Sequence, residues 1–477
     1  MLTLTGMVFI PVCFAAMAAG LRTQLTVLGM GTVLSSASVV NLSSFGIQPG
    51  YFMGLLLLAA AVALALRQGG YRLDRAVLVR VAPLALLLLV SLNALFWANA
   101  VFWDKVWVVS GRQLFDLASA QRYSFRAENI NQFAYLLLNT ALALVLADRL
   151  ARLPAQTLLR AAHAAIRGAF ALATLFVAWD WLAHHFGWYF PDAFLHSNTF
   201  YAAAHEQSFG NIARVSGPFP EPSMLAYAYG GFLAYASGCY LADRRARSLA
   251  LVLVAVTALA ISTSTTAYAV LALWAAGMVV ALPLTRLRAG TARAAGRSRL
   301  AVAALVVLAA VGAGSFMRGH QDDIQLIYDS SIAGKTQTDS YKSRTGADRM
   351  GLETFGTTWG LGLGLGSHRP NSLPVALLSD VGLAGTLAFL IFIGLCLHRP
   401  RRYGRWPGDA RALWPLRAFT LGLLVGHCVS NPVINSHLLW LSLTLNLAVT
   451  VYRNTPAQAT VQRMSLAAGA RLAQPVA

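Results

Sequence analysis

Apolar segments follow one another along almost the whole chain, and only short polar connections separate most of them. A bilayer core about 30 Å thick requires roughly 20 apolar residues at helical rise, and lipid-exposed backbone must satisfy its own hydrogen bonds. The pattern therefore predicts an all-α polytopic membrane protein with about 13 transmembrane helices. The expected spans are 3–20, 25–46, 51–66, 81–102, 130–148, 164–185, 221–242, 248–264, 266–285, 299–316, 373–397, 416–434 and 436–452.

Composition agrees with this prediction. Of the 477 residues, 57% are hydrophobic and 12% are charged, whereas a soluble domain carries about 25% charged residues. The net charge is +19, but the basic residues lie in short clusters between apolar segments, so we expect no nucleic-acid partner. We expect one integral membrane domain over 1–452 and a disordered cytoplasmic tail over 453–477.

The distribution of arginine predicts the orientation of the helices. Cytoplasmic loops of membrane proteins carry an excess of Arg and Lys, and here the arginines are concentrated in alternate connections. The opposite set of connections includes three longer polar loops, 103–129, 186–220 and 317–372, which we expect on the outer side. The arginines expected on the cytoplasmic side need no partner other than anionic lipids. These arginines are Arg22, Arg67, Arg72, Arg75, Arg80, Arg149, Arg152, Arg160, Arg244, Arg245, Arg247, Arg286, Arg288, Arg293, Arg297, Arg299, Arg399, Arg401, Arg402 and Arg405.

Few ionisable residues fall inside the expected spans. Asp180 and Asp380 are the clearest, and both lie toward the outer ends of their helices, where they are expected to shape a cavity. A channel or carrier more often places its ionisable groups near the membrane midplane. The outer loops are therefore the expected working surface. The four cysteines fall inside spans and are expected to be small buried apolar residues: Cys13, Cys239, Cys396 and Cys428.

The second outer loop ends in a polar segment directly before a span. Glu221 and Pro222 form a plausible helix start, because an acid and a proline both suit the first turn. This makes a capping role for Glu221 about as plausible as a chemical one. Arg214, held near a Gly-Pro turn at the mouth of the span, presents a planar fork of donors suited to phosphate.

The third outer loop carries more cations. Lys335, Lys342, Arg344 and Arg349 precede a run of alternating glycine and leucine from Gly360, which leads into Ser367, His368, Arg369, Pro370, Asn371 and Ser372. This run lacks the Gly-Lys-Ser/Thr ending of a Walker loop and does not match a dinucleotide fingerprint. Its glycines would let the backbone approach a ligand or another helix closely.

Several of these segments together resemble the O-antigen polymerase and ligase family of bacterial envelope polysaccharide enzymes. The resemblance rests on Arg214-x-Ser-Gly-x-Phe-x-Glu-Pro-Ser, Ser343-Arg344, Gly362-x-Gly-x-Gly-Ser, Asn371-Ser372 and Asp380-Val-Gly-Leu-x-Gly385. The segment Asn129-Ile-Asn131-Gln132-x-x-Tyr135 and the closing Ser430-Asn431-Pro432 followed by Trp440 are similar to the exopolysaccharide polymerase branch. The ligase branch usually shows His-Asn after the glycine run, where this chain has Pro370-Asn371.

The resemblance implies a C-class (GT-C) glycosyltransferase fold in the bacterial inner membrane, with its active site on the periplasmic side. It implies a donor glycan on undecaprenyl pyrophosphate, an acceptor hydroxyl on another lipid-linked repeat unit, arginines in place of a metal, and a polysaccharide co-polymerase as a possible partner. No cofactor is implied. The family pattern maps onto Arg214 and Arg344, with Arg349 as a further candidate.

These residues suit glycosyl transfer. Cleavage at the anomeric carbon builds negative charge on the pyrophosphate, and cations placed beforehand stabilise that charge. The expected pyrophosphate-binding residues are Arg214, Arg344, Arg349 and Arg369, with Arg344 also counted as catalytic, and Glu221 or secondarily His368 as the base. A ligase that transfers finished glycan to lipid A-core and a lipid-linked glycan transporter remain alternatives. His427 and His437 are expected to be satisfied helix-end histidines.

Overall fold

The computed structural model describes residues 1–43, 45–109, 120–200, 208–209, 212–287, 337–399 and 410–452. These residues are mostly helical. The longer helices are α1 (Leu4–Ala19), α2 (Leu21–Val33), α3 (Pro49–Arg67), α4 (Arg75–Phe102), α5 (Ala127–Ala151), α6 (Ala155–Phe186), α8 (Pro222–Asp243), α9 (Ala246–Ile261), α10 (Thr265–Leu287), α13 (Asp339–Thr357), α14 (Leu373–Leu397), α15 (Trp414–Ser430) and α16 (His437–Val451).

The shorter elements lie in the connections. They are the helix α7 (Asp192–Leu195), the 3-10 turn η5 (Ala410–Leu413), and the strands β1 (Val40–Asn41), β2 (Gly46–Ile47), β3 (Trp107–Val109), β4 (Ala120–Arg122), β5 (Ser208–Phe209) and β6 (Ile212–Ala213). The strands pair as three antiparallel two-stranded hairpins, β1 with β2, β3 with β4, and β5 with β6. All three hairpins lie in connections that the arginine pattern places on the outer side.

The helices agree with a membrane-embedded protein. Among the described residues, six helical segments are long and apolar enough to cross a bilayer, and four further apolar helices are shorter. A helix occupies each expected span within the described residues, although α2 ends at Val33 and residues 34–48 form a loop with the β1–β2 hairpin. The expected span 299–316 and the tail 453–477 lie outside the described residues, so the total of 13 spans stays a prediction.

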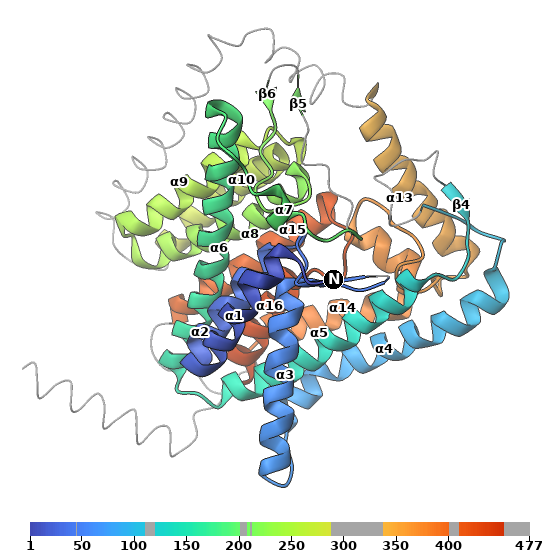
Figure 1. Ribbon diagram of the computed structural model, residues 1–477, viewed down its shortest axis with the longest axis horizontal. Coiled ribbons are helices and arrows are strands. Elements are labelled where there is room, and N and C mark those ends of the chain that lie inside the picture. The colour runs from blue at the N-terminus through green and yellow to red at the C-terminus, as the bar shows by residue number, and fades with distance from the viewer. Residues whose placement is uncertain are drawn as a thin grey trace, which may run out of the picture.

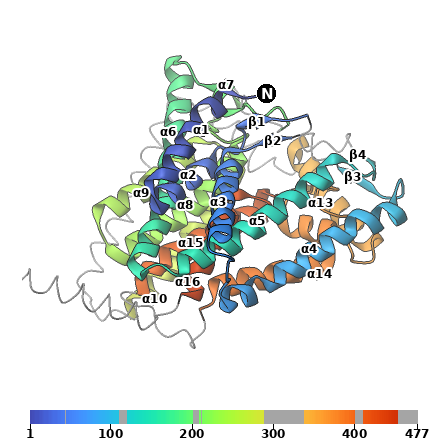
Figure 2. The same cartoon turned by 60° about the horizontal axis from the view of Figure 1, so that its bottom comes forward.

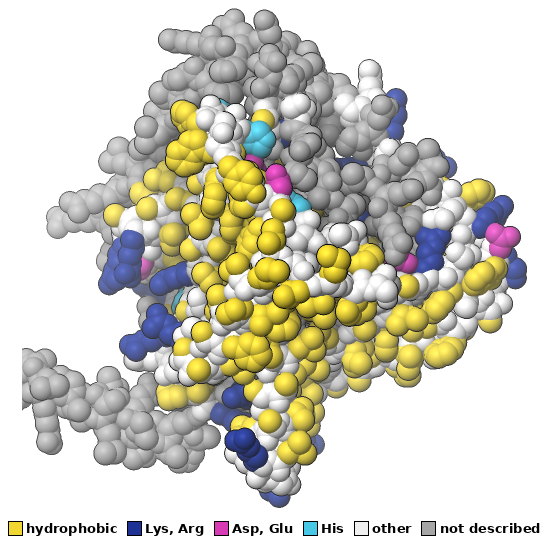
Figure 3. Space-filling model, in the orientation of Figure 1, with side chains coloured by type: hydrophobic (Ala, Val, Ile, Leu, Met, Phe, Trp, Pro, Cys, Tyr) yellow, Lys and Arg dark blue, Asp and Glu magenta, His cyan; other side chains and the backbone are white. Residues whose placement is uncertain are grey.

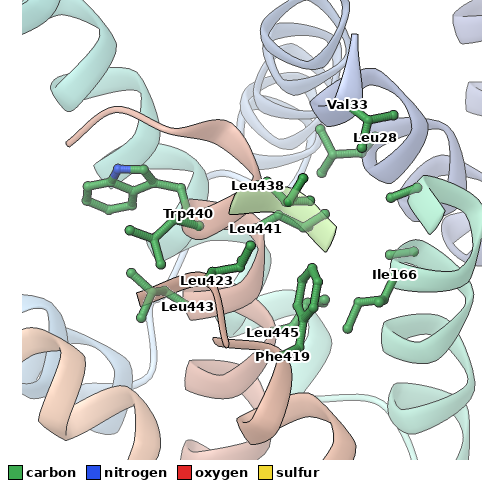
Figure 4. Close-up of a cluster of buried hydrophobic side chains, with 14 of the residues drawn as sticks. Leu28, Val33, Ile166, Phe419, Leu423, Leu438, Trp440, Leu441, Leu443 and Leu445 are labelled. Carbon is green, nitrogen blue, oxygen red and sulfur yellow. The ribbon is translucent and has the colours of Figure 1, made fainter. Parts of the chain in front are cut away.

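The helix α16 runs through the centre of the apolar core. Every residue from Leu438 to Val451 is buried. Figure 4 shows its leucines between Phe419 and Leu423 of α15, Leu28 and Val33 of α2, and Ile166 of α6. A helix that is apolar on all sides is buried among other helices, and α16 therefore ties the two halves of the chain together.

Small residues let neighbouring helices approach closely. A Cβ atom added at Gly422 of α15 would lie 2.5 Å from the carbonyl oxygen of Gly230 in α8, and one at Gly29 of α2 would lie 2.2 Å from the carbonyl oxygen of Ala165 in α6. Close contact between small residues is the usual source of helix association in lipid, because burial of apolar side chains gives little gain there. These two crossings fix α8 against α15 and α2 against α6.

The helices α4, α5 and α14 run side by side away from this core (Figures 1 and 2). Hydrophobic side chains cover much of the visible helical surface, and Lys and Arg lie in patches toward its margins (Figure 3). Of the four cysteines, Cys13, Cys239 and Cys396 are buried as expected, but Cys428 is exposed. It lies on the same exposed face of α15 as Leu421 and Val425, since residues three and four apart share a helix face.

Candidate functional site

The glycine run packs against a break in α14. Gly382 has φ 65° and ψ −169°, so the helical hydrogen-bond pattern is interrupted around Asp380. The backbone N–H groups of Leu363 and Gly364 donate to the carbonyl oxygens of Ser379 and Asp380 at 2.8 and 2.7 Å. Non-helical backbone at membrane depth is tolerated only where other protein groups satisfy it. The glycine run therefore supplies the hydrogen bonds that the broken helix lacks.

Positive φ angles explain the spacing of the glycines. Gly360, Gly362, Gly364 and Gly366 all have φ between 76° and 93°, a region that side chains rarely adopt. A Cβ at Gly362 would also lie 2.6 Å from the carbonyl oxygen of Asp380. The alternate residues Leu363 and Leu365 are buried, so the run is a fixed structural element.

The carboxyl group of Asp380 lies at the end of this run. Its two oxygens accept long hydrogen bonds from the N–H groups of Gly366 and His368, at 3.3 and 3.4 Å. Asp380 is only 7% exposed, and it lines a cavity among the described residues. Asp380 was expected to shape a cavity, and its position agrees with that expectation.

His368 is held by the backbone on both sides of its ring. Its Nδ1 accepts from the N–H of Val109 at 3.1 Å, and its Nε2 lies 2.9 Å from the carbonyl oxygen of Ala347. The Nε2 must therefore carry the proton, and burial lowers the pKa of His368 to about 4. With both nitrogens engaged, His368 joins α13 to the β3 hairpin, and this geometry gives it a structural role where the sequence suggested a base.

One face of α5 reaches all the segments around the cavity. Asn129 donates to the carbonyl oxygen of Leu365 at 2.9 Å and to Ser367 Oγ at 2.8 Å. Three residues further on, Gln132 accepts two hydrogen bonds from Asn435 Nδ2, at 2.8 and 2.9 Å. The Asn129–Tyr135 segment thus connects the glycine run to the turn between α15 and α16.

The cavity has a volume of about 250 Å³. Its lining residues come from the α2–α3 connection with the adjoining helix ends, the first turns of α5, residues 198 and 200, Phe219 with the start of α8, the end of the glycine run with Asp380, and the α15–α16 turn. The sequence prediction included two of its lining residues, His368 and Arg369. A polar cavity built from segments far apart in the sequence is the usual form of a small-molecule site.

The loop that carries Arg214 is fixed by Asp180 of α6. Asp180 Oδ2 accepts from the N–H groups of Ser216 and Gly217 at 2.8 and 2.7 Å. Gly217 has φ 57°, and a Cβ there would lie 2.6 Å from Cγ2 of Val177. The turn after Arg214 is therefore held tightly against the outer half of α6.

Arg214, Arg344 and Glu221 interact electrostatically. Burial and, to a smaller extent, the charge of Arg344 lower the pKa of Arg214 to about 10, whereas Glu221 and Tyr268 act in the opposite direction. Arg214 still carries its charge at neutral pH. Arg214 and Arg344 bring two positive charges to this site, and the buried Glu221 brings one carboxylate. Such an arrangement favours an added anion.

Glu221 begins α8, as the sequence predicted. It is the N-cap residue and Pro222 follows in the first turn, but its side chain makes no capping hydrogen bond. Instead, its carboxylate accepts from the hydroxyl of Ser223. Glu221 is 8% exposed, so its charge is directed to the interior and its role extends beyond capping.

The remaining expected cations lie in different surroundings. Arg349 is largely exposed and pairs with Glu353 on the same helix at 3.0 Å. Arg369 lies at the cavity, and its backbone N–H donates to Val109 at 3.1 Å. Asp348 of α13 accepts from the N–H groups of Asn371 and Ser372 at 2.7 and 3.2 Å, which fixes α13 to the start of α14. Lys335 lies outside the described residues.

Several cavity residues carried no role in the sequence analysis. They are Asn431, Asn435 and His437 near the α15–α16 turn, together with Gln132 and Tyr51. His427 was expected to be a satisfied helix-end histidine, but only its Nδ1 has a partner, the carbonyl oxygen of Asn431 at 2.8 Å, whereas its Nε2 has none within the described residues. His437 differs from expectation, since neither of its ring nitrogens has a hydrogen-bond partner within the described residues. A stripe of amides on one face of apolar α5 is the signal that could have revealed this cavity.

The described residues contain no group of three or more His, Cys, Asp or Glu side chains suited to hold a metal ion. The polar groups of the site are instead arginines, amides, tyrosines and isolated carboxyl groups. A scan against protein-family models finds no match for this chain, and no curated protein matches it significantly.

Proposed function

We propose that this protein is a glycosyltransferase of the bacterial inner membrane, which polymerises undecaprenyl-pyrophosphate-linked repeat units into exopolysaccharide or O-antigen on the periplasmic side. The observation that supports this most is the proximity of Arg214 and Arg344. These residues come from two outer loops that are far apart in the sequence. Their convergence beside a polar cavity suits a donor with an anionic leaving group.

The arginines would act on the pyrophosphate of the donor. When the bond from the anomeric carbon to phosphate oxygen breaks, the leaving group gains negative charge and the sugar becomes oxocarbenium-like. Cations fixed before the reaction stabilise that charge more in the transition state than in the ground state. The anchoring of the Arg214 loop by Asp180, at 2.7 and 2.8 Å, provides such fixation.

Two buried carboxyl groups can serve the acceptor hydroxyl. Glu221 lies near Arg214 in electrostatic terms, and Asp380 lines the cavity. Glu221 suits the orientation of Arg214, whereas Asp380 suits contact with an acceptor in the cavity. In this proposal, Glu221→Gln weakens donor binding and Asp380→Asn lowers turnover with bound donor.

The proposal also includes the fold class, the approach of the lipid donor and a partner protein. A body of apolar helices with its polar residues at one end is compatible with a C-class glycosyltransferase, and undecaprenyl pyrophosphate would approach Arg214 and Arg344 from the outer leaflet. A polysaccharide co-polymerase would be a partner in the control of chain length.

Reconstitution separates this function from its alternatives. Purified protein is placed in liposomes with lipid-linked repeat units and no energy source, and the products are resolved by size. Chain growth supports the polymerase. Transfer only to added lipid A-core identifies a ligase, and movement of the glycan between leaflets without bond formation identifies a transporter.

A further inference from the structure

We propose that the cavity between α5 and the α15–α16 turn binds one sugar ring of the acceptor. The assignment of this sugar to the acceptor rests on the proposed function, whereas the binding of a sugar follows from the cavity itself. Its volume of about 250 Å³ lies near the lower end for small-molecule sites, roughly 300 Å³. That space is sufficient for a single ring.

The chemistry of the lining matches a polyhydroxyl ligand. Side-chain amides face the cavity from three elements, among them Gln132 of α5, Asn198 of the α7–β5 connection and Asn435 before α16. An amide offers both donors and acceptors, and a sugar hydroxyl needs both. Aromatic rings line the same space, and Tyr51 stacks on Tyr135 with their centroids 4.4 Å apart.

The amides are fixed before any ligand arrives. Asn435 Nδ2 bonds to Gln132, Asn139 Nδ2 bonds to the hydroxyl of Tyr51 at 3.2 Å, and that hydroxyl donates to the carbonyl oxygen of Asn435 at 2.9 Å. This network joins α3, α5 and the α15–α16 turn. Groups that are already ordered lose little conformational entropy when a ligand binds.

Several buried polar atoms at the cavity lack a partner within the described residues. They are both ring nitrogens of His437, the Nδ2 of Asn431 and the hydroxyl of Ser35. Buried polar groups in folded proteins are normally hydrogen-bonded, and an unpaired group costs stability. A polyhydroxyl ligand in the cavity would complete the hydrogen bonds of these atoms.

The cavity borders the proposed donor site. Phe219 and Met224, which lie two residues before and three residues after Glu221, both contribute to its lining. Asp380 lines the same cavity. A ring bound here would hold its hydroxyl groups next to the segment that carries Glu221 and near a carboxyl group able to accept a proton.

The test uses binding, which is independent of turnover. Purified full-length protein in nanodiscs is titrated with the methyl glycosides of glucose, galactose, mannose, rhamnose and N-acetylglucosamine, and saturation-transfer NMR reports binding. We expect at least one neutral glycoside to show saturation transfer.

Two variants remove the unpaired atoms without loss of shape. His437→Phe and Ser35→Ala are each expected to weaken glycoside binding at least tenfold, and to keep or raise the unfolding temperature of the ligand-free protein. If either side chain instead made a hydrogen bond that stabilises the fold, its variant would have a lower unfolding temperature than the wild type. His185→Phe, at an exposed position near the end of α6, is the matched control and should bind as the wild type does.

The outcomes separate the two proposals. Unchanged glycoside binding by His437→Phe, or no binding of any neutral glycoside by the wild type, overturns the sugar site. Glycoside binding without chain growth in liposomes supports the sugar site and overturns the polymerase. Chain growth with a wild-type acceptor KM in both variants supports the polymerase and overturns the sugar site.

Discussion

The arginines at the two ends of the helices have different surroundings. At the inner end, Arg80 donates to the carbonyl oxygens of Leu395 and His398, and Arg399 donates to those of Val449 and Thr450. These carbonyls lie at the C-terminal ends of α14 and α16, where cations are favourable. The inner arginines therefore hold helix ends in place.

At the outer end, Arg214 and Arg344 interact electrostatically, and the charge of Arg344 contributes to the lowered pKa of Arg214. Repulsion of this kind does not stabilise the fold. A pair of like charges that the structure keeps together is better explained by an anionic ligand than by stability. The same residue type thus has a structural role at one end of the protein and a proposed chemical role at the other.

The largest effect is expected when either arginine of the outer pair is removed. Arg214→Ala and Arg344→Ala should each lower polymer formation about 10²–10³-fold, the usual cost of removing one group that stabilises transition-state charge. Membrane levels and unfolding temperature should stay near wild type. Gel analysis of the polymer in a strain that carries each variant measures this effect, with Arg349→Ala as the control. Full-length polymer from both variants would contradict the role of the pair.

The reverse result is expected at the inner end. Arg80→Met should lower the free energy of unfolding by about 3 kcal/mol, because charge-assisted hydrogen bonds at the end of α14 are lost, while turnover per folded molecule stays unchanged. Thermal unfolding in detergent and assays normalised to folded protein check both parts. The exposed Arg75 provides the control variant Arg75→Met. A fall in turnover without a change in stability would remove the contrast between the two ends.

Acid should affect the outer end through His368. Its pKa is about 4 in the folded protein, against an ordinary value of 6.5, so the unfolded chain takes up the proton first as the pH falls. The folded state therefore loses about 3 kcal/mol of stability between pH 6.5 and pH 4, from a shift of about 2.5 units. Unfolding temperatures of the wild type and His368→Asn over this range test the effect. An equal pH dependence in both proteins would show that His368 is not its source.

The smallest effect concerns the glycine run. Gly362→Ala should destabilise the protein by about 2 kcal/mol, because alanine is strained at positive φ and its Cβ would lie 2.6 Å from the backbone of Asp380. Gly356→Ala in α13 is the matched control, since a Cβ there has open space and should raise stability by about 0.5–1 kcal/mol. Chemical denaturation of the two variants gives the comparison. Equal stabilities would mean that the run is not fixed.

The sequence predicted the helices well because apolar length is a local property. The start of α8 at Glu221 and Pro222 was predicted correctly for the same reason, since capping depends on a few adjacent residues. The end of α2 at Val33 was not, because residues 34–48 remain rather apolar although they form a loop and hairpin. Hydropathy alone does not separate a buried loop from a helix.

The site was harder to predict because it depends on contacts between distant segments. The hydrogen bonds of His368 to Val109 and Ala347 join residues 259 and 21 positions away, and no local pattern shows them. His437 likewise looked like a helix-end residue, whereas the structure leaves its nitrogens unpaired beside a cavity. The interaction of Arg214 with Arg344 likewise joins residues far apart in the sequence, and no local pattern shows it.

The central claim is that Arg214 and Arg344 bind one pyrophosphate together, and a double-mutant cycle on donor affinity tests it most directly. The Kd of an undecaprenyl-pyrophosphate-linked repeat unit is measured for the wild type, Arg214→Gln, Arg344→Gln and the double variant in nanodiscs. We expect each single change to weaken binding at least tenfold and the double change to weaken it by less than the product, because the two residues share a ligand group. Wild-type affinity in all three variants would contradict the claim.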